Sequence, residues 1–328
     1  KLDYDYTTEQ LLGLLKFADN QFARWDAAQM LFTQELRRNV AHFQQGEAFD
    51  ISPDVLTALA HVLENYEQDI ELATLILTLP KDIEFAESFK TIDPDGIAAT
   101  REFMLVQIAE YLKEDLLRIY THIRLEDYQV TQKDIALRAM RNLCLSYLAY
   151  TNLGNNVVQK HYNNANNMTD TLAALNMATK AALPCRDTLL VDFEQKWQHD
   201  GLVMDKWFAL QATRPDENVL EIVQALMDHP SFNFNNPNRL RSLVGSFANH
   251  NLKAFHHISG SGYRFLTDVL IRLNETNPQV AARLIEPLIR FSRFDAQRQT
   301  LMKRALERLS AVEELSKDLF EKIEKALQ

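Results

Sequence analysis

Three of the nine histidines in this 328-residue chain lie within one fourteen-residue stretch, HNLKAFHHISGSGY at positions 250–263. Clustered imidazoles raise the possibility of a metal site. A zincin helix needs His-Glu-x-x-His, which places two imidazoles one turn apart beside a glutamate base. His256 and His257 are adjacent and therefore point about 100° apart on a helix. The spacing argues against a zinc site and for a corner between helices.

The glycines of the same stretch are the other chemical candidate. Gly260-Ser261-Gly262 lacks the Gly-Lys-Ser/Thr ending of a phosphate-binding loop and follows no strand. We expect Gly260 or Gly262 to supply a positive φ just before a helix that begins near Tyr263. No motif elsewhere in the chain marks a nucleophile or a second metal site, so no catalytic residue and no cofactor are predicted within this chain.

Two arginine-containing segments are more informative. In NPNRLRSLVGSF (236–247), Arg241 lies on a helix stripe with Gly245 and Ala248, where small residues leave room for a guanidinium. In NPQVAARLIEPLIR (277–290), Gln279 and Arg283 share a stripe that also contains Pro287. If the helices stack in register, Arg241 and Arg283 face one surface. Two solvated arginines are the alternative interpretation.

Pro287 has a second consequence for this segment. A proline inside a helix removes a backbone donor and clashes with the preceding turn. We therefore expect the helix to kink near Pro287, which leaves the carbonyl of Arg283 without its usual partner.

Apolar spacing is helical almost throughout, and convincing alternating strands are absent. Four helix starts place a capping side chain directly before proline, which fits the first helical position. The first two starts are 41 residues apart and so are the last two, within the range of HEAT-type helix pairs. The sequence predicts an all-α array of antiparallel helix pairs, HEAT-like and curved. The four starts are Ser52-Pro53, Asp93-Pro94, Asn236-Pro237 and Asn277-Pro278.

Two other caps are predicted from short motifs. The asparagine-rich stretch 152–170 reads as corners, with Thr169 or Asp170 capping the helix that runs to Lys180. The final helix is expected to open with a capping box at Ser310-x-x-Glu313.

Composition excludes several classes of function. A net charge of −10 disfavours a general nucleic-acid or anionic-membrane surface, and no apolar run approaches the roughly 18 residues of a membrane span. Cys144 and Cys185 form no paired motif, so a reducing, cytoplasmic compartment is expected. The chain opens KLDYDYTTEQ without an initiator methionine, which suggests a piece of something longer.

Several strings in order resemble a known family: RWDAAQ (24–29), NNMTD (166–170), LPCRD (183–187), GLVMDKWF (201–208), NPNRLRSL (236–243), GSGYRFL (260–266) and NPQVAARLIEPLIR (277–290). Together they resemble the C-terminal domain of bacterial aminopeptidase N, the zinc-dependent alanyl aminopeptidase of the gluzincin group. The resemblance covers residues 1–328.

The resemblance implies a helical domain that closes over a zinc catalytic domain of the same polypeptide and walls a cavity for peptide substrates. The zinc motif and the GAMEN substrate motif of the family do not occur in this chain. By motif match, Arg241, Gln279 and Arg283 would contribute to the substrate channel without being catalytic. The alternative is a free-standing helical-repeat scaffold that binds protein partners.

Overall fold

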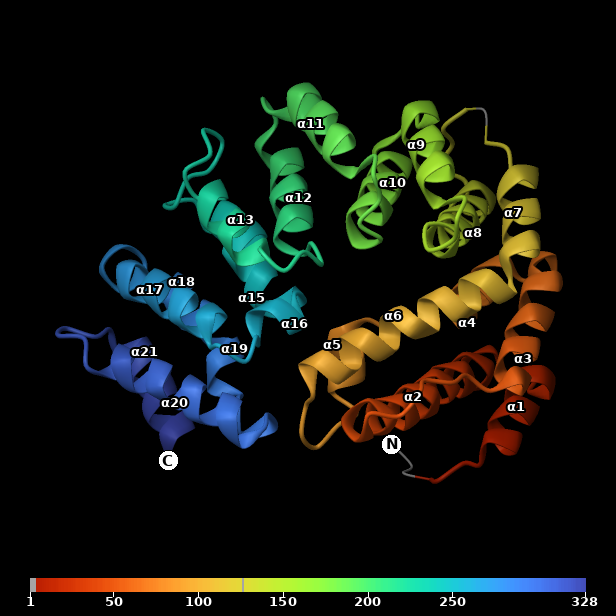
Figure 1. The fold of residues 1–328 in the computed structure, drawn as a ribbon. Coiled ribbons are helices and arrows are strands. Elements are labelled where there is room, and N and C mark those ends of the chain that lie inside the picture. Colours follow the sequence, from red (N-terminus) through yellow and green to blue (C-terminus); the bar gives the residue numbers. More distant parts are fainter. Residues whose placement is uncertain (1–3, 126) are drawn as a thin grey trace. The chain divides into compact units, whose positions relative to one another are not determined.

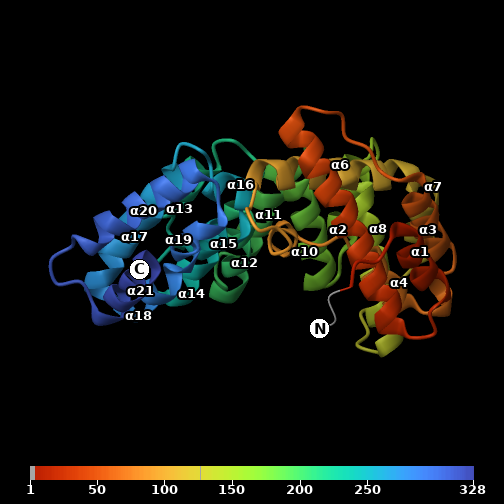
Figure 2. The same cartoon turned by 90° about the horizontal axis from the view of Figure 1, so that it is seen from below.

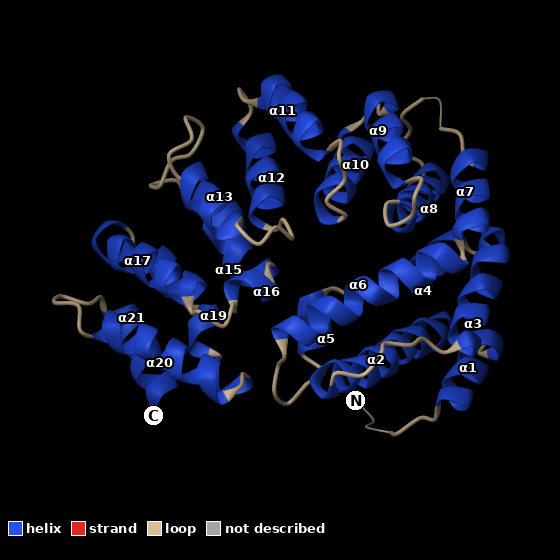
Figure 3. Ribbon diagram, in the orientation of Figure 1, coloured by secondary structure: helices blue, strands red, loops and turns tan. Residues whose placement is uncertain are grey.

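Every regular element in the described part of the chain is helical. The computed structural model describes residues 4–125 and 127–328, and Figure 3 shows helices joined by loops across these ranges. The single β-bridge among them pairs Ile92 with Phe294. The prediction of an all-α fold is confirmed.

The chain divides into two compact units, residues 1–85 with 96–189, and residues 86–95 with 190–328. Helix α11 (Arg186–Trp197) contributes residues to both. The elements of the first unit are α1 (Thr8–Phe17), α2 (Gln21–Gln45), α3 (Pro53–Glu64), η1 (Tyr66–Gln68), α4 (Ile70–Leu77), α5 (Asp82–Ala86), α6 (Pro94–Tyr111), α7 (Lys113–His122), α8 (Gln132–Leu148), α9 (Gly154–Asn164) and α10 (Met168–Lys180) (Figure 1).

Helix α8 is the centre of the first unit, where it packs against α4, α7, α9 and α10. Its side chains Leu145 and Leu148 are fully buried. The Tyr147 hydroxyl donates a 2.6 Å hydrogen bond to the carbonyl of Leu77, which ties α8 to the end of α4. Helix α8 therefore joins the first unit through its buried apolar side chains and through this hydrogen bond to α4.

The second unit is built from shorter helices. Its elements are α12 (Gly201–Ala212), α13 (Val219–Leu226), α14 (Pro237–Leu240), η2 (Arg241–Gly245), α15 (Ser246–His250), α16 (Leu252–Phe255), α17 (Ser261–Thr276), α18 (Pro278–Leu284), α19 (Glu286–Ile289), η3 (Phe291–Arg293), α20 (Ala296–Ser310) and α21 (Lys317–Leu327). Helix α12 packs on η2 and α15, α17 packs on α18 and α20, and α18 packs on α21. Figure 2 shows α17, α18, α20 and α21 gathered at one end of this unit.

A segment from far earlier in the chain, residues 86–95, belongs to the second unit. The amide of Ile92 donates to the carbonyl of Arg293 at 2.7 Å. The Arg293 guanidinium donates to the carbonyls of Ala86 and Phe89. Glu87 forms ion pairs with Arg290 and Arg293. These contacts anchor the start of α20 to a strap about two hundred residues away in sequence.

The predicted proline starts are confirmed, but the Ser52 side chain makes no capping hydrogen bond to α3. Two further predicted caps are wrong. Helices α3, α6, α14 and α18 begin at Pro53, Pro94, Pro237 and Pro278. Neither Thr169 nor Asp170 caps α10, because Asn167 accepts from the amide of Asp170 instead. Asp170 is buried one turn further on, where it accepts a 2.9 Å hydrogen bond from Asn142.

The capping box predicted at Ser310 is also wrong. Ser310 is the last residue of α20, and its hydroxyl donates to the carbonyl of Glu307. Helix α21 begins only at Lys317, after Ser316. A serine can satisfy a carbonyl at a helix end as readily as an amide at a helix start, so its type alone does not tell the two apart.

The glycine corner follows the prediction. Gly260 has φ +68° and precedes α17, which begins at Ser261. Gly262 lies inside α17, where a Cβ would sit 2.2 Å from the carbonyl oxygen of Phe255. Gly260 is needed for its backbone angle and Gly262 for the close approach of two chain segments.

His256 is buried beside this corner, where it contacts two aromatic side chains. Its ring stacks on Phe294 at 4.1 Å between centroids, and Nδ1 lies 3.0 Å from the Tyr263 hydroxyl. Burial, and then the charges of Arg298 and Arg290, lower the pKa of His256 to about 3. His257, by contrast, is exposed.

We expect Gly262→Ala to lower the free energy of unfolding by about 1–3 kcal/mol, because the backbone must shift to admit the methyl group. Gly13→Ala is the matched control, since Gly13 lies within α1 with no atom near its would-be Cβ. That change should stabilise by roughly 0.5–1 kcal/mol through helix propensity. Urea unfolding followed by circular dichroism measures both. Equal effects of the two substitutions would contradict the clash.

The low pKa of His256 predicts a loss of stability on mild acidification. An unfolded histidine titrates near 6.5, so between pH 6.5 and about 3 the unfolded chain binds a proton that the folded chain refuses. Stability should therefore fall by up to about 1.4 kcal/mol per pH unit from this group.

The comparison of His256→Gln with His257→Gln isolates this effect. Unfolding free energies between pH 7 and 4.5 should depend less steeply on pH in His256→Gln than in the native chain. His257→Gln, which replaces the exposed neighbouring imidazole, is the comparison. His161 contributes a similar slope, because burial lowers its pKa to about 4, but it is common to all three proteins. An unchanged slope in His256→Gln would rule out the assignment.

Candidate functional site

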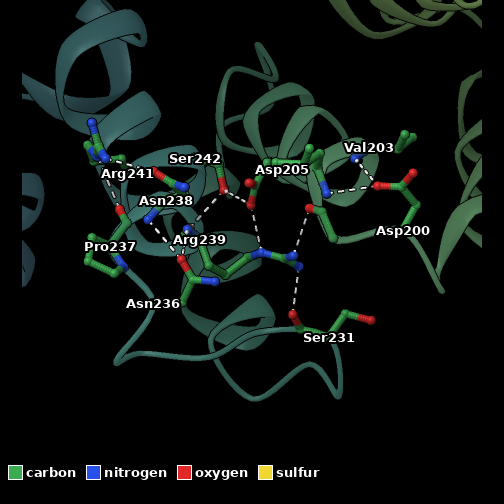
Figure 4. Close-up of polar contacts among 12 residues, drawn as sticks. Asp200, Val203, Asp205, Ser231, Asn236, Pro237, Asn238, Arg239, Arg241 and Ser242 are labelled. Atoms are coloured by element: carbon green, nitrogen blue, oxygen red, sulfur yellow. Dashed lines mark hydrogen bonds and ion pairs between the residues drawn. The ribbon is translucent and has the colours of Figure 1, made fainter.

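Arg241 lies at the start of a π-helical turn on the surface of the second unit. Its Nε donates to the carbonyl of Pro237 at 3.2 Å and its Nη2 to Oδ1 of Asn238 at 2.7 Å. The guanidinium therefore turns back on the first turn of its own helix, as Figure 4 shows. The side chain is exposed, and both contacts are ones that a stronger ligand could displace.

The turn that begins at Arg241 is wider than an α-helical turn. Residues 241–245 form the π-helical turn η2, and π-turns occur often at functional sites. Gly245 lies under the aliphatic part of Arg241 and also faces Leu284 of α18, so the small-residue stripe is used for close packing. The stripe brings α18 close to the helix that carries Arg241.

Arg239, two residues before Arg241, is buried where Arg241 is exposed. Only 6% of its surface is exposed. It donates to Asp205 at 2.7 Å, to the carbonyl of Ser231 at 2.6 Å and to the carbonyl of Gly201 at 2.9 Å (Figure 4). Its guanidinium also lies 4.9 Å from the centre of the Phe208 ring. Arg239 lies in α14 and connects it to α12 and to the loop that follows α13. Its role is structural.

Gln279 and Arg283 lie on one exposed face of α18 and line a groove of about 510 Å³. Ala282 forms the floor between them, and helix α21 supplies the other wall. Arg241 is not among the residues that line this groove. The structure thus brings two of the three predicted site residues together and places the third elsewhere on the same unit.

Four charged residues of α21 complete the groove and were not predicted from the sequence. They are Asp318, Glu321, Lys322 and Lys325. Their spacing of three, four and seven residues places them on one face of the helix. The opposite face buries Leu319 and Ile323. The pattern is visible in the sequence, but which neighbour the charged face meets depends on the packing of α21 on α18.

The charges in the groove are only partly neutralised. Lys322 pairs with Glu286, and Glu321 lies 3.8 Å from the exposed Lys317. Within the described residues, the side chains of Arg283 and Lys325 have no hydrogen bond or ion pair, and the same holds for the side chain of Asp318. Two cations and one carboxylate are therefore available to a ligand.

The helix break predicted at Pro287 is confirmed. Helix α18 ends at Leu284, and α19 begins at Glu286 with Pro287 in its first turn. The short α19 carries Glu286 toward Lys322 of α21. The break thereby sets the partner of one lysine of the groove.

The described residues contain no group of three or more histidine, cysteine, aspartate or glutamate side chains placed to hold a metal ion. The described side chains therefore do not fit the zinc ion that the family resemblance implies. The candidate residues described above, Arg241, Gln279 and Arg283, offer hydrogen-bond donors and charges to a ligand.

Arg239 and Arg241 give a matched test of the two roles. We expect Arg239→Ala to lower the free energy of unfolding by about 3–5 kcal/mol, because it removes the charge partner of Asp205 and the donor to the carbonyls of Ser231 and Gly201. Arg241→Ala should change it by less than about 0.5 kcal/mol, since the side chain is exposed. Chemical denaturation of both variants measures the difference. A large loss in Arg241→Ala would assign that residue to the scaffold.

Several known proteins are similar to this chain. No described helix has the length and apolarity to cross a membrane. The chain is 87% identical over 328 residues to aminopeptidase N of Haemophilus influenzae and 50% identical over 329 residues to that of Escherichia coli, covering all of this chain and 38% of each relative. Thus the chain spans about two fifths of the length of these relatives.

A solved structure and a family model agree with these relatives. The crystal structure of Legionella pneumophila aminopeptidase A in complex with aspartic acid is similar with a TM-score of 0.88 and 27% identity, over 99% of this chain and 39% of that one. A family model described as a domain of unknown function (DUF3458_C) with ARM repeats matches residues 8–328. The chain therefore belongs to the DUF3458_C family of ARM-repeat domains, in a form that closely matches part of bacterial aminopeptidase N.

Proposed function

We propose that residues 1–328 are the C-terminal helical domain of a zinc aminopeptidase that removes N-terminal amino acids from peptides. The observation that carries this proposal is the 87% identity to aminopeptidase N along the whole chain. In this proposal the chain is one part of a longer polypeptide, in keeping with its 38% share of that relative, and the zinc ion and the catalytic residues belong to the other part.

In this proposal the domain walls the internal cavity that holds the substrate and gates its entry. Its partners are the catalytic domain of the same polypeptide and the peptide substrates, and the enzyme acts in the cytoplasm. The binding character of the groove supports this role, since its side chains offer charges and hydrogen bonds but no activated nucleophile or metal ligand set.

Arg283 is the residue best suited to hold the far end of a peptide. Its guanidinium is permanently charged, lies in a groove and has no partner among the described residues. A peptide beyond its first residues presents backbone carbonyls and a terminal carboxylate, both acceptors for such a donor. Gln279, one turn away, adds an amide, and Arg241 is a further donor on the same unit.

We expect Arg283→Ala in the full-length enzyme to lower kcat/KM for peptides more than for aminoacyl anilides. An anilide has no tail to reach Arg283, so the loss should be confined to peptides and amount to about 1.5–3 kcal/mol for a charge-assisted hydrogen bond. Arg241→Ala should act in the same direction. Steady-state kinetics with a tetrapeptide and an anilide that share the same first residue measure the difference.

Arg304→Ala is the control for this experiment. Arg304 is exposed on α20, has no partner among the described residues and does not line the groove. It should leave both substrates unaffected. Equal losses on peptide and anilide in Arg283→Ala would indicate a structural role. A native gene product no longer than this chain would favour the free-standing scaffold instead.

A further inference from the structure

The charges on the groove face of α21 are ordered by sign along the helix. Asp318 and Glu321 lie toward the start of the helix, and Lys322 and Lys325 lie toward its end. Asp318 and Lys325 are seven residues apart, which is roughly 10 Å along a helix that rises about 1.5 Å per residue. The groove is therefore acidic at one end and basic at the other.

Helix α18 runs in the same direction as α21 along this groove. The amide of Ser316, just before α21, donates to Asn274, which lies one turn before α18. Further along, Glu286 beyond the end of α18 meets Lys322. Gln279 is therefore the nearer of the two α18 residues to the acidic end, and Arg283 is the nearer to the lysines.

The helix dipole explains part of the order of charges along α21. It does not explain why unpaired charges from two helices line one groove. Acidic groups in the first turn and basic groups in the last turn stabilise a helix through its dipole. That effect needs no neighbouring helix and says nothing about Arg283. The concave placement of Asp318, Arg283 and Lys325, all without partners among the described residues, is an independent feature.

We infer that this groove selects peptides by the order of their charges. The terminal carboxylate binds at Lys325 and Arg283, and a basic side chain about three residues earlier binds at Asp318. Three residues follow from the span, because an extended chain advances about 3.3–3.6 Å per residue. This inference rests on the proposed function and adds to it a substrate class, basic near the carboxyl end.

The expected size of the preference is modest. Pairs between exposed charges contribute about 0.2–1 kcal/mol, so each pair should change kcat/KM roughly one-and-a-half- to fivefold. Such pairs are screened by salt, since the Debye length falls to about 3 Å at 1 M ionic strength. The preference should therefore shrink steeply between low and high salt.

The test uses the full-length enzyme and two otherwise identical peptides, with Arg or Glu three residues before the last residue. The native enzyme should prefer the Arg peptide, and Asp318→Lys should reverse that preference. A reversal that depends on the peptide is not produced by a purely structural defect. Glu324→Lys is the matched control, because Glu324 is exposed on the same helix but does not line the groove.

The carboxylate is tested separately with Lys325→Ala. The ratio of kcat/KM for a free-acid peptide to that for its carboxamide should fall roughly one-and-a-half- to fivefold, and Lys253→Ala, an exposed lysine outside the groove, should leave it unchanged. If Asp318→Lys and Lys325→Ala behave like their controls, this inference is overturned. If peptide-selective losses in Arg283→Ala are still seen, the proposed function stands without it.

Discussion

The second unit depends on one buried guanidinium. Arg298 is 6% exposed and donates to the carbonyl of His256 at 2.6 Å, to Asp295 at 2.8 Å and to Asp95 at 2.5 Å. It thereby holds the end of α16, the start of α20 and the strap at residues 86–95 together. A protein made only of helices leaves backbone carbonyls unpaired at every helix end. An arginine with five donors can satisfy several of these at once.

Arg239 repeats this solution, with two carbonyls and one carboxylate around a buried guanidinium. The scaffold thus uses a buried arginine where several chain segments meet, and removing such a side chain leaves its acceptors without their charged donor. Arg283 differs in kind, because its guanidinium lies in an open groove with no partner among the described residues. The same side chain is a structural tie in one place and a binding group in the other, and burial makes the difference.

The sequence predicts the helices better than their ends. Proline fixes φ at the first helical position, so the four proline starts could be located from local chemistry alone. The cap of α10 could not, because Asn167, Thr169 and Asp170 are all good caps and the choice depends on the burial of Asp170 beside Asn142. Ser310 fails for a similar reason, since it closes one helix and does not open the next.

The sequence predicts only part of the candidate site, again because the rest depends on tertiary contacts. Gln279 and Arg283 were found from one helix stripe, which is local information. Arg239 and Arg241 are only two residues apart, yet Arg239 is buried while Arg241 turns back on Asn238. The sequence alone does not predict this difference. The contribution of α21 required knowing that α18 packs against it, which is a property of the folded unit.

The helix break at Pro287 connects the scaffold to the charges of the groove. Because α18 cannot continue through Pro287, the chain redirects at Ile285 and presents Glu286 to Lys322. That pairing neutralises one of the two lysines on the groove face of α21. Among the described residues that line the groove, the cations left without a partner are Arg283 and Lys325, one from each wall. A continuous helix would point Glu286 elsewhere, so the proline determines which cations remain available for a carboxylate.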